Sequence, residues 1–305
     1  MNLTGDAGRA GVVASPPVVC RYQNTPAATV ASATVTAAAT RVHRSLRPMS
    51  EWYFFGRNCS ATFHPVHFAW ERLTPSVHRC RLAFCDVTVG LVSGRAGALL
   101  IDSGTTLTEA AAIDSDAREL AGRPITHIVL THKHFDHVLG SAWFTDADVY
   151  CAPDVVDYLS SNTGEIRHQA LSYGAGAAEI DRAIAALRPP RHAVYDAVID
   201  LGDRAVTITH PGRGHTSSDL VVTAPGRDGD NGPVVVFTGD LVEESADPYI
   251  DADSDLAAWP ATLDRLLAVD GPDAVYVPGH GKVVDAEFIR RQREWLSRRA
   301  ASTSG

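Results

Sequence analysis

Three histidines and one aspartate fall within six consecutive positions, 132–137, which read H-x-H-x-D-H. An apolar run at 128–130 leads into this motif, so we expect a β-strand that ends where the motif begins. Side chains alternate along an extended chain, so His132 and His134 face the same side and can converge on one cation. The following turn brings Asp136 and His137 beside a second position. The motif therefore predicts a metal site at the carboxyl end of a strand, where α/β folds bind ligands; a solvated histidine-rich loop is the alternative.

Three glycine-rich turns later in the chain supply further residues of metal-ligand type. Each turn follows a β-branched run and ends at or beside His215, Asp240 or His280. Glycine lets a backbone turn tightly and approach a ligand closely, although a single turn of this kind usually marks only a change of direction. Together with the first motif, the turns give five histidines and two aspartates. Seven ligands exceed the four of one tetrahedral site, so they suit two zinc ions with Asp240 as a bridge, and iron or manganese fits the same residue types.

Short β-branched runs alternate with helix-like stretches from about residue 67 onward, which predicts the α/β class. We expect strands at 87–92, 98–101, 125–130, 149–152, 194–199, 205–209, 220–223, 234–237 and 274–277. We expect helices at 108–120, 155–160, 177–187, 256–269 and 286–298. The segment 225–232 is typical of a hairpin turn, and 157–187 is interpreted as a helical flap over the site.

The two ends of the chain differ in composition from its centre. Residues 1–48 carry five arginines against one aspartate and few large apolar side chains. Such a segment cannot bury enough surface to offset its ordering entropy, so we expect a disordered N-terminal extension, with a transit peptide or a start at Met49 as alternatives. The folded domain is expected at 49–300, followed by a disordered tail at 301–305.

Composition excludes several classes of protein. The 305 residues carry a net charge of −9 and contain no apolar run approaching the roughly 18 residues of a membrane-spanning helix. No basic cluster stands out to follow a phosphate backbone, so we expect a small-molecule substrate and neither nucleic acid nor membrane as a partner. Five cysteines without a repeating spacing suit a reducing cytoplasm. The oligomeric state is left open, a homodimer included.

The four motifs together resemble the metallo-β-lactamase-fold superfamily over roughly residues 68–300. The resemblance implies an αββα sandwich, in which two mixed sheets are flanked by helices and the metal site lies at the sheet edges. It implies that Asp240 binds both metals, and it divides the other ligands into a first set, His132, His134 and His215, and a second set, Asp136, His137 and His280. Asp102, in the strand-to-turn segment 99–104, would orient a ligand, and helix capping by the adjacent hydroxyl residues is compatible with that role.

The resemblance further implies a hydrolase of the glyoxalase II and lactonase-like branch. Two zinc ions would generate a hydroxide that attacks the carbonyl of an ester, thioester or lactone, with Asp136 guiding the proton. Arg213 and Lys282 are candidates to receive a substrate carboxylate, and solvated surface charge is the alternative for both. Other hypotheses are a mononuclear iron persulfide dioxygenase-like oxidoreductase, a β-lactam amide hydrolase and a noncatalytic metal-binding module.

The remaining histidines and tryptophans are interpreted as structural. We expect His64 and His67 at the surface, His127 packed in the core and His210 in a structural role at a strand end. The core is expected to include Trp70, Trp143, Trp259 and Trp295, with Trp259 as a candidate pocket-lining residue.

Overall fold

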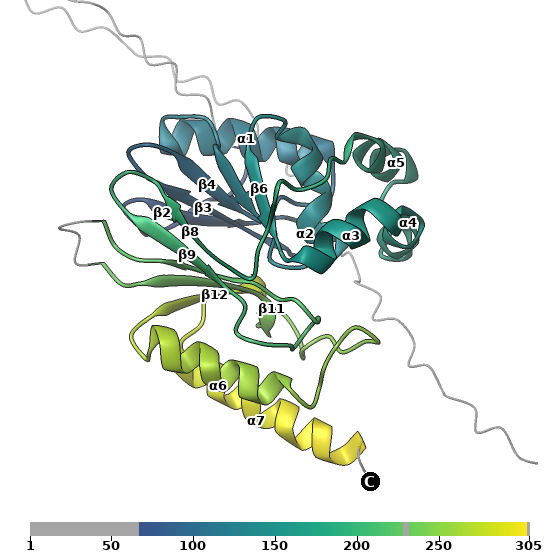
Figure 1. Cartoon of the computed structure of the whole chain (residues 1–305), viewed down its shortest axis with the longest axis vertical. Helices are drawn as coiled ribbons and strands as arrows, with labels where there is room; N and C mark the ends of the chain where they lie inside the picture. Colours follow the sequence, from purple (N-terminus) through teal and green to yellow (C-terminus); the bar gives the residue numbers. More distant parts are fainter. Residues whose placement is uncertain (1–66, 228–231, 304–305) are drawn as a thin grey trace, which may run out of the picture. The chain divides into compact units, whose positions relative to one another are not determined.

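Two mixed β-sheets packed between helices make up the part of the chain that the computed structural model describes, residues 67–227 and 232–303 (Figure 1). The first sheet runs in chain order: β1 (Glu71–Thr74), β2 (Val77–Arg81), β3 (Thr88–Ser93), β4 (Ala98–Ile101), β5 (His127–Val129), β6 (Asp148–Cys151) and β7 (His192–Ala193). The second has the order β12 (Val275–His280), β11 (Val235–Glu243), β10 (Val221–Ala224), β9 (Ala205–Thr209) and β8 (Asp196–Asp200). The predicted αββα sandwich is confirmed.

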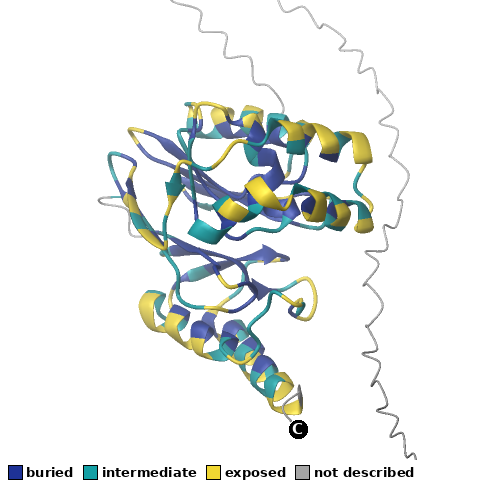
Figure 2. Ribbon diagram, turned by 45° about the vertical axis from the view of Figure 1, so that its right-hand side comes forward, coloured by how far each residue is buried: buried dark blue, intermediate teal, exposed yellow. Residues whose placement is uncertain are grey.

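Helices cover the outer faces of both sheets. Those of the first sheet's side are α1 (Leu107–Ala121), α2 (Phe135–Val138), the 3-10 helix η1 (Leu139–Trp143), α3 (Pro153–Ser161), α4 (Thr163–Ser172) and α5 (Ala177–Ala186). Those of the second are α6 (Trp259–Asp270) and α7 (Ala286–Thr303). Figure 2 shows buried residues along the sheets and the inward faces of these helices. Among the described residues, no helix combines the length and apolar character needed to cross a membrane.

Each sheet contains both antiparallel and parallel pairs, because some strands are joined by hairpins and others by connections that contain helices. β1 to β4 pair antiparallel, whereas β4 to β7 pair parallel across connections that contain α1, α2 and α3 to α5. β8 to β11 form an antiparallel meander, and β12 returns parallel to β11 after α6. All nine residues of β11 are buried, so this strand is covered on both of its faces.

Local sequence explains where α1 begins and ends. Thr106 and Glu109 form a capping box, in which each side chain accepts a hydrogen bond from the other residue's backbone N–H. The helix ends at Gly122, whose φ of 65° is the left-handed conformation that glycine adopts without strain. Of the hydroxyl residues that follow Asp102, Thr106 caps the helix, whereas the hydroxyl of Ser103 donates to the carbonyl of His137.

Several sequence expectations differ from the structure. β1 and β2 were not expected, because β2 carries polar residues; Arg79 is nevertheless buried, pairing with Glu71 and donating to the carbonyl of Gly281. Trp143 was expected in the core, but it is 44% exposed in η1, where its indole N–H donates to Asp114. The prediction failed there because a short irregular helix has no fixed buried face.

The ends of the expected domain are only partly described. The predicted extension 1–48 and the segment 49–66 lie outside the described residues, as does His64. At the other end α7 continues to Thr303, so the expected tail at 301–305 begins inside a helix. The expected flap, 157–187, forms α3 to α5 with the intervening turns, and its apolar residues pack into the main core.

Asp116 of α1 fastens the start of the described chain to the first helical layer. Its buried carboxylate accepts hydrogen bonds from the backbone N–H groups of His67 and Phe68, and from the indole of Trp70. The imidazole of His67 adds a contact of 2.8 Å to the same carboxylate. Burial raises the pKa of Asp116, but these hydrogen bonds outweigh burial and lower it below its usual value.

We expect Asp116→Asn to destabilise the fold in a pH-dependent way. An asparagine amide would point a donor at donors, so the loss should be about 2 kcal/mol at pH 7, or a thermal midpoint roughly 4–8 °C lower. Because the folded-state pKa lies below the unfolded-state value, the carboxylate stabilises the fold above about pH 4, and this contribution disappears as the pH falls through the folded-state pKa.

Thermal unfolding of both proteins at neutral pH and near pH 3 measures this difference. Glu119→Gln, on the exposed side of α1, is the matched control and should leave the midpoint unchanged. A gap between Asp116→Asn and the wild type that stays constant with pH would contradict the role given to the carboxylate.

Candidate metal centre

Seven histidine and aspartate side chains from both sheets meet where strands end. His132 and His134 follow β5, and α2, one turn later, carries Asp136 and His137. The second sheet contributes the others: His215 from the β9–β10 loop, Asp240 from within β11 and His280 from the end of β12. The structure therefore brings together all seven residues that the sequence singled out, in two neighbouring groups.

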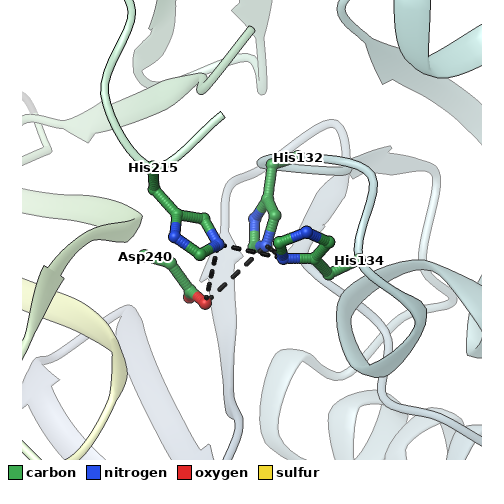
Figure 3. Close-up of side chains that lie close together, drawn as sticks. All are labelled: His132, His134, His215 and Asp240. Carbon is green, nitrogen blue, oxygen red and sulfur yellow. Dashed lines mark hydrogen bonds and ion pairs between the residues drawn. The ribbon is translucent and has the colours of Figure 1, made fainter. Parts of the chain in front are cut away.

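The first group comprises His132, His134, His215 and Asp240 (Figure 3). Nδ1 of His134 lies 3.1 Å from Nε2 of His132 and 2.9 Å from Nε2 of His215. An Asp240 oxygen lies 3.5 Å from Nε2 of His215 and 3.7 Å from Nε2 of His132. Two nitrogen ligands about 2.05 Å from a tetrahedral zinc ion stand about 3.3 Å apart, so these spacings match a shared cation.

The second group comprises Asp136, His137 and His280. The Nε2 atoms of the two imidazoles are 3.3 Å apart, and Asp136 lies 3.7 Å from His137 and 3.6 Å from His280. Asp240 also reaches this group, with one oxygen 3.3 Å from His137 and the other 3.2 Å from His280. Asp240 thus borders both groups, as expected for a bridging carboxylate.

Hydrogen bonds to the outer ring nitrogens turn four of the five imidazoles inward. In each of these rings Nδ1 contacts a protein oxygen and Nε2 points into the centre; His134 instead points Nδ1 inward. The oxygen partners are Thr131 Oγ1 for His132, Asp102 Oδ2 for His137, the Tyr249 carbonyl for His215 and the Cys85 carbonyl for His280. Such bonds fix ring orientation and leave the inner nitrogen available as a metal ligand.

Asp102 occupies the orienting position that the sequence assigned to it. Its carboxylate contacts Nδ1 of His137 at 2.8 Å and accepts hydrogen bonds from the backbone and hydroxyl of Thr131 at 2.8 and 2.9 Å. The residue has a φ of 58°, a left-handed conformation that is uncommon outside glycine. This strained turn is held between β4 and the metal-ligand motif, which links the ligands to the first sheet.

The electrostatics of the two groups favour a cation. Burial lowers the pKa values of His132 and His215 below the usual range, so these rings are neutral and able to coordinate. Burial also lowers the pKa of His137, but nearby carboxylates, foremost Asp240, outweigh it and raise the pKa to about 9. The second group therefore attracts positive charge, which a metal ion would supply in place of protons.

A buried carboxylate oxygen without a hydrogen-bond partner also indicates that the site fits zinc. Asp240 Oδ1 is buried and accepts no hydrogen bond, which is costly unless a cation binds it. Imidazole nitrogen and carboxylate oxygen are both ordinary zinc ligands. The described residues at this place therefore form two adjacent groups that could hold a metal ion.

Glycines permit the close approach of β11 and β12 at this centre. A Cβ at Gly279 would lie only 1.9 Å from Asp240 Oδ1, so any larger residue there would collide with the carboxylate. Gly239 has a φ of 52°, and a Cβ there would press on Thr131. The glycine-rich turns that the sequence indicated are thus required by the site itself.

Comparison with known proteins identifies the superfamily. The model of the metallo-beta-lactamase superfamily matches residues 82–280, which include all seven candidate ligands. The chain belongs to the metallo-beta-lactamase superfamily. A curated relative in this superfamily, the metallo-beta-lactamase type 2 of Bacteroides fragilis, is 29% identical over 119 residues, or 38% of this chain. The match spans less than half of that relative, 45% of its length.

Solved superfamily structures share the fold at low sequence identity. The metallo-beta-lactamase FIM-1 of Pseudomonas aeruginosa, solved in a mono-zinc form, is 20% identical, with a TM-score of 0.57 over 76% of this chain and 95% of its own. The DIM-1 metallo-beta-lactamase is 16% identical, with a TM-score of 0.58 over 75% and 97%. At these identities the likeness establishes the architecture of this superfamily member and leaves its substrate to its own residues.

The two cations proposed to receive a substrate carboxylate lie differently from the metal ligands. Arg213 is 61% exposed in its side chain and already forms an ion pair with Asp255 at 3.3 Å. Lys282 is exposed, and its backbone N–H donates to Glu244. Neither contact reaches a metal ligand, so both residues remain proposals for substrate binding.

Other structural roles expected from the sequence are met. His210 contacts the Asp219 carbonyl at 2.9 Å, and His127 is half-buried against Thr126 at 2.8 Å. Trp259 is fully buried, with its ring centroid 5.8 Å from that of His215, so it belongs to the core and also supports a ligand.

Residues that the sequence did not single out tie the loop after β11 to this centre. Lys133 and Asp253 form an ion pair at 2.9 Å, and the ammonium lies 4.6 Å from the centre of the Tyr158 ring. The hydroxyl of Ser254 donates to the carbonyl of His215. The acidic stretch 251–255 was the one available signal, and sequence spacing alone gave it no partner.

We expect Gly279→Ala to reduce metal binding by displacing Asp240. The added methyl group would overlap the carboxylate oxygen, so metal content should fall well below that of the wild type while the fold persists. Metal analysis of the purified variant after equilibration with zinc, together with circular dichroism, measures both effects. Gly164→Ala in α4, where a Cβ meets no atom within 4 Å, should keep full metal content. Equal metal content in the two variants would show that Asp240 tolerates displacement.

Proposed function

We propose that this protein is a dinuclear zinc hydrolase that cleaves an ester, thioester or lactone of a small-molecule substrate. The observation that carries the proposal is the pair of adjacent ligand groups that share Asp240. Superfamily membership supports metal-dependent hydrolysis as the class of reaction. Zinc ions bound in these groups would lower the pKa of a water molecule from 15.7 to about 7 and polarise the carbonyl under attack.

The chain's own residues would position the reacting groups. Asp102 keeps His137 in one tautomer with Nε2 turned inward, and the Cys85 carbonyl does the same for His280. Asp136 is 6% exposed and lies within 3.7 Å of both imidazoles of the second group. Its carboxylate is therefore placed to accept the proton released during attack and to pass it to the leaving group.

The presence of two ligand groups favours the hydrolase over the mononuclear oxidoreductase. An iron enzyme with a single metal would need the first group alone, whereas the second group here retains Asp136, His137 and His280 with inward-facing donor atoms. A β-lactam amide stays an alternative substrate class, because the described residues do not distinguish an amide from an ester. A noncatalytic module has no need of two complete ligand groups.

The cellular setting is part of the same proposal. Cys80 and Cys151 are buried thiols that form no disulfide among the described residues, which suits a reducing cytoplasm. A small neutral or weakly charged metabolite is the class of partner proposed.

We expect the purified protein to bind about two equivalents of zinc and to hydrolyse members of a panel of esters, thioesters and lactones. Asp240→Ala should lower kcat/KM by at least about 100-fold and reduce the zinc stoichiometry, because one carboxylate serves both groups. Metal analysis and steady-state kinetics on the zinc-loaded protein measure the two effects.

Asp273→Ala is the matched control, because this aspartate is exposed just before β12. Its zinc content and kinetics should equal those of the wild type. A stoichiometry of one metal, with iron and a requirement for dioxygen, would overturn the hydrolase proposal. Full activity in Asp240→Ala would overturn the bridging role.

A further inference from the structure

Two partly exposed tyrosines lie beside the metal centre on segments that the ligand motifs do not include. Tyr173 follows the last residue of α4 on the first sheet's side and is 38% exposed. Tyr249 lies in the loop after β11, on the second sheet's side, and is 44% exposed. A tyrosine presents an apolar ring with a polar tip, so a partly exposed tyrosine beside a candidate site can contact a bound ligand.

Tyr173 borders the second ligand group through Phe135. The centroids of the two rings are 5.5 Å apart, and Phe135 lies between His134 and Asp136 in the chain. Phe135 is buried and also packs against Phe84, with ring centroids 6.4 Å apart. Phe84 precedes Cys85, whose carbonyl holds His280, so a row of three aromatic rings flanks this group.

Tyr249 borders the first ligand group. Its carbonyl contacts Nδ1 of His215 at 3.2 Å, and the centroids of the two rings are 6.5 Å apart. The carbonyl of Tyr249 is therefore engaged by a candidate ligand, and its partly exposed ring is the part of the residue that can contact a substrate.

The two tyrosines border the ligand groups from the two sheets' sides, Tyr173 through Phe135 and Tyr249 through His215. Burial raises the pKa of Tyr173, so its side chain remains a neutral phenol at physiological pH. The pair thus presents uncharged aromatic surface from both sides of the metal centre.

Cations near the first group are already neutralised. Lys133 pairs with Asp253 and lies over the Tyr158 ring, and Arg213 pairs with Asp255. On this side, aromatic rings rather than unpaired cations are available to recognise a substrate.

We propose that Tyr173 and Tyr249 bind an apolar or aromatic group attached to the carbonyl, and that the enzyme selects substrates carrying such a group. The inference rests on the proposed hydrolase function and gives it a substrate class. A substrate ring that contacts these tyrosines would lie directly beside the ligand groups. The carbonyl attached to that ring would then lie at the metal positions. The tyrosines act in this scheme as specificity-determining residues through their rings.

The test compares three esters: methyl acetate, methyl phenylacetate and benzyl acetate. The last two are isomers that carry the same ring on the acyl or the alcohol side, and neither releases an unusually good leaving group. Where the active bond class is the thioester, the corresponding thioesters of methanethiol and phenylmethanethiol replace them. We expect the wild type to show a KM about ten-fold lower for at least one aromatic isomer than for methyl acetate.

Variants assign that preference to the two rings. Tyr173→Ala and Tyr249→Ala should each raise the KM for the preferred aromatic ester several-fold, up to about ten-fold, with kcat within about two-fold and methyl acetate unaffected. Tyr173→Phe and Tyr249→Phe keep the rings and should behave as the wild type. Tyr195→Ala is the control, because Tyr195 is equally exposed, at 45%, and contacts His210. Zinc content is measured for every variant.

The possible outcomes separate this inference from the function on which it rests. If the zinc-loaded wild type hydrolyses no ester, thioester or lactone, the proposed hydrolase function fails. If it hydrolyses them without preference for an aromatic group, the hydrolase stands and the inference is overturned, whatever the folding of the variants. Equal losses on all three esters, or a loss of kcat in the phenylalanine variants, would also overturn it, because either would assign the tyrosines a structural or hydroxyl-based role.

Discussion

The close packing of buried imidazole nitrogens and carboxylate oxygens is the constraint on which this structure depends. Imidazole nitrogens of His132, His134 and His215 lie about 3 Å apart beside a buried carboxylate, with a second such group adjoining. Without a cation, these groups repel one another or leave buried polar atoms unsatisfied, and Asp240 Oδ1 is such an atom. The protein must hold the arrangement by packing and hydrogen bonds formed elsewhere. Two rigid sheets, each carrying ligands at its strand ends, provide that support.

Hydrogen bonds hold the ligands, and further hydrogen bonds hold the residues that contact them. Asp102 holds His137 and is itself held by Thr131, while the loop after β11 accepts a contact from His215 and donates back through Ser254. These bonds set the tautomer and direction of each ring before any metal binds, which reduces the reorganisation needed on binding. Glycine at position 279 is part of the same device, because it lets β12 pass against the Asp240 carboxylate.

Local sequence pattern made most of the candidate metal site predictable, and tertiary contacts decided the rest. The apolar run before the H-x-H-x-D-H motif predicted a strand ending at ligands, because alternation and chain direction are local properties. β2 could not be predicted in this way, since its Arg79 is buried only by pairing with Glu71 and the Gly281 carbonyl. The prediction that Trp143 is buried was wrong, because its size suggested burial but η1 leaves it exposed. Spacing gave no signal that Tyr173 and Tyr249 would lie beside the ligand groups.

The metal-ligand residues were predictable and the two tyrosines were not, because they lie in different parts of the fold. Ligands sit at strand ends, which the hydrogen-bonded sheets fix to a narrow geometry, so any change there disturbs the metal positions. Tyr173 and Tyr249 lie on connecting segments whose backbone is anchored but whose side chains are partly free. Connections of this kind can change composition without moving the sheets. The likeness to DIM-1 and FIM-1 therefore shows a shared architecture, and the contacts that select a substrate must be sought among this chain's own connecting segments.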